Sequence, residues 1–150
     1  RRDVQFLVAK TKVAPLTGMT IPRLELLAAV LLAKLVQSVT TALEPTVSIE
    51  NVLCYTDSRV TWHWITEQRE WKQFVRRRVQ EIRERVPAAA WRHCPGKDNP
   101  ADVASRGTTL TELALDEKWK CGPAWLKTSD GQEISASSMP EECRAEMSRR

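Results

Sequence analysis

The feature that most constrains the fold is a long apolar segment over residues 20–43 that has helix signals at both ends. Thr20 can act as its N-cap, Pro22 suits the first helical turn, and another proline follows soon after its end. Runs rich in β-branched and apolar residues lie on either side, over 4–13 and 47–55. The sequence therefore predicts a strand, a helix and a second strand in succession, which is typical of α/β proteins.

The segments that follow continue this alternation. Two helices are predicted over 59–67 and 69–86, and the second has an apolar face at steps of three and four residues. A third strand over 88–93 and a short helix that begins at Pro100 follow. The predicted order is therefore β-α-β-α-α-β-α. Small polar residues gather near the C-terminus, so residues 127–150 are predicted to be a linker or a disordered tail.

The composition fits one domain of an intracellular protein. Of the 150 residues, 42% are hydrophobic and 28% are charged, which is ordinary for a globular domain. The longest apolar stretch, 26–33, is shorter than a membrane span requires, so no membrane partner is expected. The four cysteines are scattered, which favours a reduced protein without structural zinc. Because the chain begins with Arg1, we expect it to be a piece of a longer reading frame.

The distribution of charge is more informative than the net charge of +4. Basic residues outnumber acidic ones between residues 59 and 85, and this excess could serve a phosphate backbone. Arg76, Arg77 and Arg83 lie on the polar face of the predicted second helix of this segment and are the candidate nucleic-acid contacts. The alternative is an ordinary solvated helix face.

Glu25 is the first of three carboxylates in positions that suggest a site. Glu25 and Lys34 are the only charged residues in the stretch 24–35, and their spacing places them on opposite sides of a helix. Lys34 falls on the expected solvent side, so Glu25 is predicted to point inward, where a carboxylate needs a partner or a metal. The alternative is a first-turn acid that complements the helix dipole.

Asp57 and Asp102 are the other two carboxylates. Asp57 follows the predicted strand 47–55, at the sheet edge where α/β folds place functional groups. Its alternative role is a helix cap, which Asp57 or Ser58 could fill equally well. Asp102 lies in the first turn of the short last helix, where an acid also suits the helix dipole. Convergence of these two carboxylates with Glu25 would create a site for Mg²⁺ or Mn²⁺, and two such ions can promote phosphodiester hydrolysis.

Five blocks of the sequence together resemble a known family. They are VAKTKVAP at 8–15, IPRLELLAA at 21–29, YTDS at 55–58, WRHCPGKDNPADVASRG at 91–107 and CGPAWL at 121–126. These blocks are similar to the ribonuclease H domain of BEL/Pao-type retrotransposon Pol polyproteins. The resemblance extends over about residues 4–126, so residues 1–126 are taken as one ribonuclease H-like domain. It implies an α/β fold with a mixed sheet flanked by helices.

The resemblance also implies roles for individual residues. Glu25, Asp57 and Asp102 match metal-site carboxylates of the family, which uses two Mg²⁺ or Mn²⁺ ions. His93 matches a mobile histidine that assists proton transfer or product release, with a hydrogen-bonded surface histidine as the alternative. The implied substrate is an RNA–DNA hybrid, and the implied neighbours are the reverse transcriptase and integrase domains of the same polyprotein. The implied location is a cytoplasmic particle or the nucleus.

One departure from the family pattern matters for activity. The first catalytic Asp of the family would lie upstream of Arg1, and Asp3 does not match it. The resemblance also implies that this chain lacks the first two strands of a five-stranded sheet. We therefore expect the isolated chain to be unstable or inactive and to be completed by upstream polyprotein sequence. The leading function is an endonuclease for the RNA strand of hybrids, and the alternative is a catalytically incomplete or domesticated nucleic-acid-binding or spacer domain.

Overall fold

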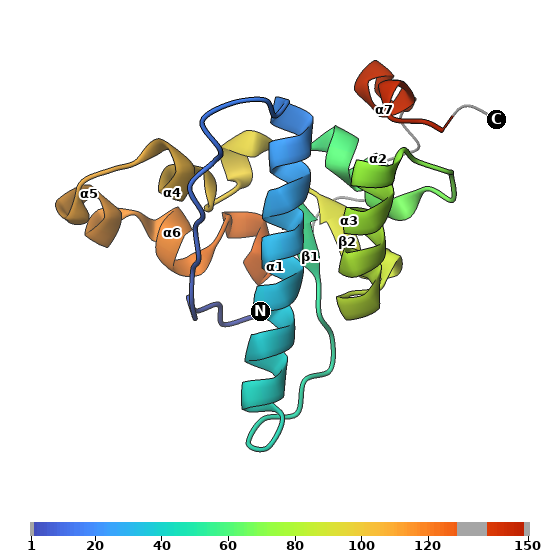
Figure 1. Ribbon diagram of the computed structural model, residues 1–150. Helices are drawn as coiled ribbons and strands as arrows, with labels where there is room; N and C mark the ends of the chain where they lie inside the picture. The colour runs from blue at the N-terminus through green and yellow to red at the C-terminus, as the bar shows by residue number, and fades with distance from the viewer. Residues whose placement is uncertain (1, 129–137, 149–150) are drawn as a thin grey trace.

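The computed structural model describes residues 2–128 and 138–148, which form a mostly helical α/β fold with a small parallel sheet (Figure 1). In chain order, with η for a 3-10 helix, the elements are α1 (Ile21–Leu43), β1 (Cys54–Thr56), α2 (Arg59–Thr66), α3 (Gln73–Arg85), η1 (Ala88–Ala90), β2 (Trp91–His93), η2 (Gly96–Asp98), α4 (Asp102–Arg106), α5 (Leu110–Leu115), α6 (Glu117–Cys121), η3 (Ala124–Lys127) and α7 (Glu141–Ala145). In Figure 1, α2 and α3 lie on one side of α1, and α4, α5 and α6 lie on the other. The predicted α/β class is confirmed.

Helix α1 is the longest element and forms where the sequence predicts it. Pro22 lies in its first turn, while Thr20 occupies the N-cap position without making a capping bond through its side chain. By length and composition alone α1 is also long enough to cross a membrane, a property that the core helices of soluble proteins share. Its buried stripe packs against α3 and α2 and consists of Leu26, Ala29, Val30 and Ala33.

Strands β1 and β2 pair in parallel, with residues 54–56 opposite residues 91–93 in order. Helices α2 and α3 form the crossover between them, as parallel pairing requires. Both strands are shorter than the runs predicted over 47–55 and 88–93, because the ladder pairs only residues 54–56 with residues 91–93. Strand β1 also extends one residue beyond the first predicted run. Since the strands are parallel, their carboxyl ends lie at the same edge of the sheet.

The strand predicted over residues 4–13 is wrong. These residues run extended but form no strand, and no backbone–backbone hydrogen bond connects residues 3–19 to any other described residue. β-branched residues favour an extended backbone, yet a strand also requires a neighbour that completes its hydrogen bonds. Phe6 packs on Trp119, with ring centroids 5.1 Å apart, whereas Val13 is 92% exposed.

The core lies between the sheet and helices α1, α2 and α3. Helix α3 contributes Val75, Val79 and Ile82 at steps of three and four residues, which confirms the predicted apolar face, although the helix begins at Gln73 and not at 69. The largest fully buried side chains are Trp64, Trp91, Leu26, Ile65, Ile82 and Val75. The long crossover and α1 therefore hold the sheet in place.

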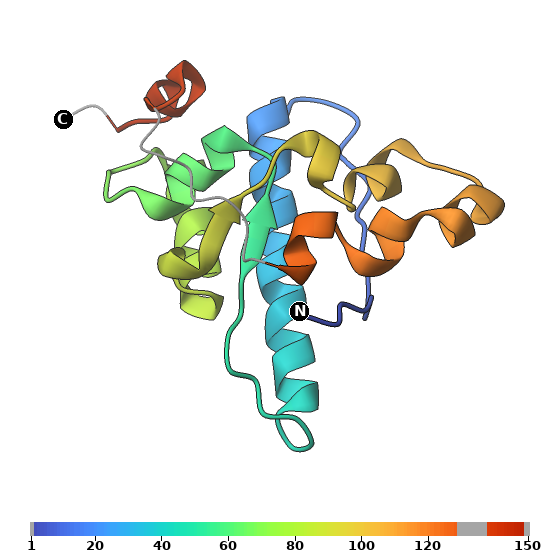
Figure 2. The ribbon, with the colours of Figure 1, turned by 180° about the vertical axis from the view of Figure 1, so that it is seen from behind.

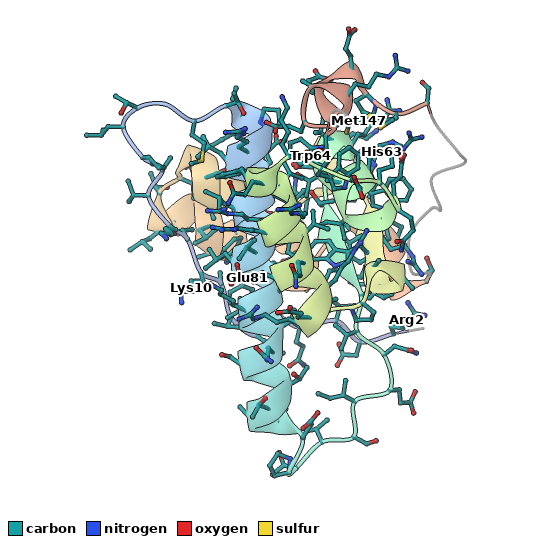
Figure 3. The ribbon with its side chains drawn as sticks, turned by 45° about the vertical axis from the view of Figure 1, so that its right-hand side comes forward. Arg2, Lys10, His63, Trp64, Glu81 and Met147 are labelled. Carbon is teal, nitrogen blue, oxygen red and sulfur yellow. The ribbon has the colours of Figure 1, made fainter. Side chains whose placement is uncertain are left out.

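The described part of the C-terminal tail packs against this core, unlike the linker that the sequence predicts. Cys143 of α7 is fully buried, and Glu146 forms an ion pair with Arg23 at 2.7 Å. Met147 packs on the core and lies near Trp64 in the view of Figure 3. The tail thus adds a contact to the first turn of α1, while residues 129–137 and 149–150 of the predicted linker lie outside the described residues.

Candidate active site

The carboxyl ends of β1 and β2 lie at one end of the sheet, and the loop that contains η2 follows β2 there. Figure 2 shows the N-terminal end of α1 at the same end of the molecule. In α/β folds, functional groups gather at the edge where parallel strands end. The same part of the fold therefore contains the start of α1, which carries Glu25, and the end of β2, which carries His93. It also contains the end of β1, which Asp57 directly follows.

Asp57 is half-buried directly after β1, and its carboxylate faces the η2 loop. Its Oδ2 accepts a hydrogen bond from Asn99 Nδ2 at 3.1 Å. Gly96 lies on the same side, where a Cβ would stand 3.7 Å from Oδ2, at ordinary contact distance. The Asp57 carboxylate is therefore bonded to one neutral side chain, the amide of Asn99. Because Gly96 has no side chain, the loop does not crowd the carboxylate on that side.

The cap of α2 is Ser58 and not Asp57. Ser58 Oγ accepts a hydrogen bond from the Thr61 N–H at 3.1 Å, and the Ser58 N–H donates to Thr56 Oγ1 at 3.1 Å. Of the two capping candidates in the sequence, the structure uses the serine. The Asp57 carboxylate is thus not needed to begin the helix.

The η2 loop beside Asp57 is supported by Trp125 of η3, a residue distant from it in the sequence. Trp125 Nε1 donates a hydrogen bond to Asp98 Oδ2 at 3.3 Å, and the Trp125 ring packs against Tyr55 with centroids 5.5 Å apart. Sequence reasoning did not identify this support, because the partners are far apart along the chain. Its only signal was the presence of the 121–126 block in the family resemblance.

His93 ends β2 and contacts Asp57. Its Nε2 lies 3.2 Å from the backbone carbonyl oxygen of Asp57. Because a carbonyl oxygen can only accept, Nε2 carries the hydrogen in this bond, which leaves Nδ1 as the acceptor of a neutral ring. The structure thus brings His93 to Asp57, and the ring is partly buried at the end of the sheet.

We expect His93 to titrate below the usual pKa of 6.5. Burial is the main cause of the lowered pKa, and Arg59 and His63 act in the same direction, whereas Asp57 opposes them. The unfolded chain then binds the proton more readily than the folded one, so stability decreases as the pH falls from about 6.5 toward the folded pKa. A histidine-selective NMR titration measures this pKa, and a midpoint above 6.5 would contradict the expectation.

Asp102 and Glu25 are both half-buried. Helix α4 begins at Asp102 and not at Pro100, so Asp102 lies in its first turn as predicted. The Asp102 Oδ2 pairs with Arg106 Nε at 3.0 Å, and the helix-dipole role remains compatible with its position. Glu25 lies beyond the first turn of α1, which contains no acidic residue. The dipole role proposed as its alternative is therefore not supported. No described residue forms a hydrogen bond or ion pair with the Glu25 side chain.

The donor chemistry of these carboxylates fits Mg²⁺ or Mn²⁺, which bind oxygen ligands. Within residues 2–128 and 138–148, however, no group of three or more His, Cys, Asp or Glu side chains lies close enough together to hold a metal ion. Asp57 is bonded to Asn99, and Asp102 to Arg106. The convergence of the three carboxylates therefore stays a prediction.

Of the three arginines predicted to contact nucleic acid, Arg83 has a structural role. Its Nε and Nη2 donate to the Ile65 carbonyl at 2.8 and 2.6 Å, and Nη2 also donates to the Glu67 carbonyl at 2.9 Å. These bonds tie α3 to the end of α2. Arg76 and Arg77 are exposed, and their side chains form no ion pair or hydrogen bond within the described part of the chain.

Arg76 and Arg83 also line a pocket of about 380 Å³ between α3 and the loop before it. Its other lining residues are Arg69, Trp71, Val79, Gln80 and Glu84. None of the three candidate metal ligands lines this pocket, so it is separate from the end of the sheet where Asp57 lies.

Comparison with known proteins identifies part of this α/β chain. The sequence profile of one family, described as a Pao retrotransposon-like RNaseH-like domain, matches residues 1–58. Residues 1–58 are therefore part of a Pao retrotransposon RNaseH-like domain, as the resemblance indicated. The match includes Glu25 and Asp57 but ends before His93 and Asp102, for which the resemblance stays a prediction. No match to this chain was found among curated proteins or among solved structures.

Proposed function

We propose that this chain belongs to a metal-dependent endonuclease that cleaves the RNA strand of RNA–DNA hybrids during retrotransposon reverse transcription. The family match over residues 1–58 carries the proposal, because it contains two of the three proposed metal ligands. The setting of Asp57 supports it further, since this half-buried carboxylate follows a parallel strand and does not cap a helix. Such a carboxylate is suited to a metal site that hydrolyses phosphodiesters.

Each site residue has a part in this proposal. Glu25, Asp57 and Asp102 would hold Mg²⁺ or Mn²⁺ together with the substrate phosphate. When bound, such ions polarise the phosphate and generate a nucleophilic water. His93 would accept a proton at Nδ1, because its Nε2 is bonded to the Asp57 carbonyl. Exposed arginines of α3, above all Arg76 and Arg77, would contact the phosphate backbone of the hybrid without reading its bases.

Upstream polyprotein sequence is proposed to complete the domain and to supply the first catalytic Asp. Residues 4–13 support this part of the proposal, because they are extended, have the composition of a strand and lack backbone hydrogen bonds to the described residues. Reverse transcriptase and integrase domains of the same polyprotein are the proposed neighbours. A cytoplasmic particle or the nucleus is the proposed location.

Cleavage of an end-labelled RNA–DNA hybrid in Mg²⁺ or Mn²⁺ tests the proposed function. We compare this chain with a form extended upstream by its polyprotein sequence. The extended form is expected to cut the RNA strand of the hybrid, to leave RNA and DNA duplexes intact, and to stop when the metal is chelated. This chain alone is expected to be inactive. An extended form that folds and binds the hybrid without cutting it would contradict the proposal and favour the nucleic-acid-binding or spacer role.

A further inference from the structure

Asn99 connects two of the candidate metal ligands, although the proposed function gives it no role. Its side-chain Nδ2 donates to Asp57 Oδ2 at 3.1 Å, and its backbone carbonyl accepts from the Asp102 N–H at 3.3 Å. Asn99 follows η2 and comes shortly before α4. One residue therefore joins the end of β1 to the start of the helix that carries Asp102.

The Asn99 side chain is fixed in one orientation. While Nδ2 donates to the carboxylate of Asp57, Oδ1 accepts from the Ala101 N–H at 3.0 Å. Turning the amide by half a rotation would place oxygen against oxygen at Asp57 and amino group against N–H at Ala101, so both contacts would become repulsive. The Asn99 N–H is also bonded to the Gly96 carbonyl at 3.2 Å, and Pro100 restricts the backbone of Asn99.

This arrangement sets the direction of the Asp57 carboxylate. Among the described residues, Asn99 is the only one that donates a hydrogen bond to it. A bond to Oδ2 alone restricts the rotation of the carboxylate and leaves Oδ1 available to another ligand. Hydrogen-bond partners that orient metal-binding groups typically change metal affinity or activity by about 10- to 100-fold when they are removed.

We propose that Asn99 is a positioning residue of the proposed nuclease. It holds Asp57 by Oδ2 so that Oδ1 can meet a divalent cation, and it fixes the start of α4, and with it Asp102, relative to Asp57. This inference rests on the proposed function, because the cation it serves belongs to that reaction. The bond from His93 to the Asp57 carbonyl restrains the same residue from its backbone side.

Three substitutions in the upstream-extended form separate positioning from a purely local role in the turn. Asn99→Asp keeps an acceptor for the Ala101 N–H and nearly the same size, but it removes the donor to Asp57. Asn99→Ala removes both contacts. Asn51→Asp makes the same chemical change at an exposed position and serves as the matched control.

We expect both Asn99 variants to lower kcat for hybrid cleavage by about 10- to 100-fold, with KM for the hybrid unchanged. The Mn²⁺ concentration that half-saturates the rate should rise, and Mn²⁺ binding measured by electron paramagnetic resonance without substrate should weaken. Asn51→Asp should behave like the unsubstituted protein. If Asn99→Asp kept its rate and Mn²⁺ affinity, Asn99 would act only in the turn and the proposal would be overturned. Tighter Mn²⁺ binding in Asn99→Asp would also overturn it, because the position would then be that of a ligand.

A second measurement separates failure of this inference from failure of the proposed function. If the unsubstituted extended form folds but cuts no hybrid, the proposed nuclease function fails, and the contact between Asn99 and Asp57 is then tested by its effect on the stability of that folded form. Melting temperatures of Asp57→Ala, Asn99→Ala and the double variant form a cycle that reports the coupling between the two side chains. Non-additive shifts are the expected result, and additive shifts would overturn the link between Asn99 and Asp57.

Discussion

Replacing Asp57 by Asn in the upstream-extended form is expected to lower the rate of hybrid cleavage by about 100-fold or more, because a group that stabilises charge in the reaction is lost. The amide has nearly the same size and can still accept the bond from Asn99. It lacks the negative charge that attracts a divalent cation. Since Ser58 caps α2, the substitution should leave the fold intact.

Glu117→Gln is the control for Asp57→Asn, because Glu117 is an exposed carboxylate of α6 and the change removes the same charge. Initial rates at saturating hybrid and melting temperatures are measured for both variants. We expect a large loss of rate in Asp57→Asn at an unchanged melting temperature, and no loss in Glu117→Gln. Equal rates for Asp57→Asn and the unsubstituted form would show that Asp57 is not a metal ligand.

Leu26→Ala is expected to destabilise the fold by about 2–5 kcal/mol, the range for removing a fully buried leucine side chain. Leu26 is 0% exposed and belongs to the stripe by which α1 packs on α3 and α2. The substitution leaves a cavity beside these helices, while alanine itself suits a helix well. Urea unfolding followed by circular dichroism measures the change in the free energy of unfolding.

Leu115→Ala makes the same change at a helical position that is 76% exposed. Its free energy of unfolding is expected to stay within about 0.5 kcal/mol of the unsubstituted protein. Similar losses for Leu26→Ala and Leu115→Ala would mean that α1 does not pack as described. The comparison matters for the site as well, since Leu26 is adjacent to Glu25.

Local signals in the sequence were sufficient to predict the helices that pack in the core. The apolar periodicity and Pro22 located α1, and the steps of three and four residues located the buried face of α3. These features depend on residues within a few turns of one another. For the same reason Asp57 could be placed correctly at the end of a strand and at the start of a helix.

Features that depend on distant partners could not be predicted in the same way. Residues 4–13 have the composition of a strand, but a strand forms only beside another one, and no described strand is hydrogen-bonded to these residues. The packing of residues 138–148 depends on the ion pair with Arg23 and on the burial of Cys143. The small polar residues near the C-terminus do not indicate either contact. The structural role of Arg83 likewise depends on carbonyl groups of another helix.

In the candidate site, too, local features could be predicted and contacts between distant residues could not. The sequence suggested Glu25, Asp57 and Asp102 from their places in single elements, yet it could not indicate that Asn99 bonds to Asp57 across the fold. It also left open whether Asp57 or Ser58 caps α2, because either side chain can accept the bond. Only the three-dimensional arrangement decides such questions, since equivalent local chemistry is available to both residues.

Glu25, Asp57 and Asp102 are proposed to act together as one metal site. Manganese-induced broadening of backbone amide signals in the NMR spectrum of the upstream-extended form tests this claim most directly, because this paramagnetic effect decreases steeply with distance from the ion. We predict that the amides of all three residues broaden together at the lowest Mn²⁺ concentrations and that Asp57→Asn abolishes this response. Broadening confined to one of them, or spread over exposed acidic residues such as Glu117, would contradict the claim.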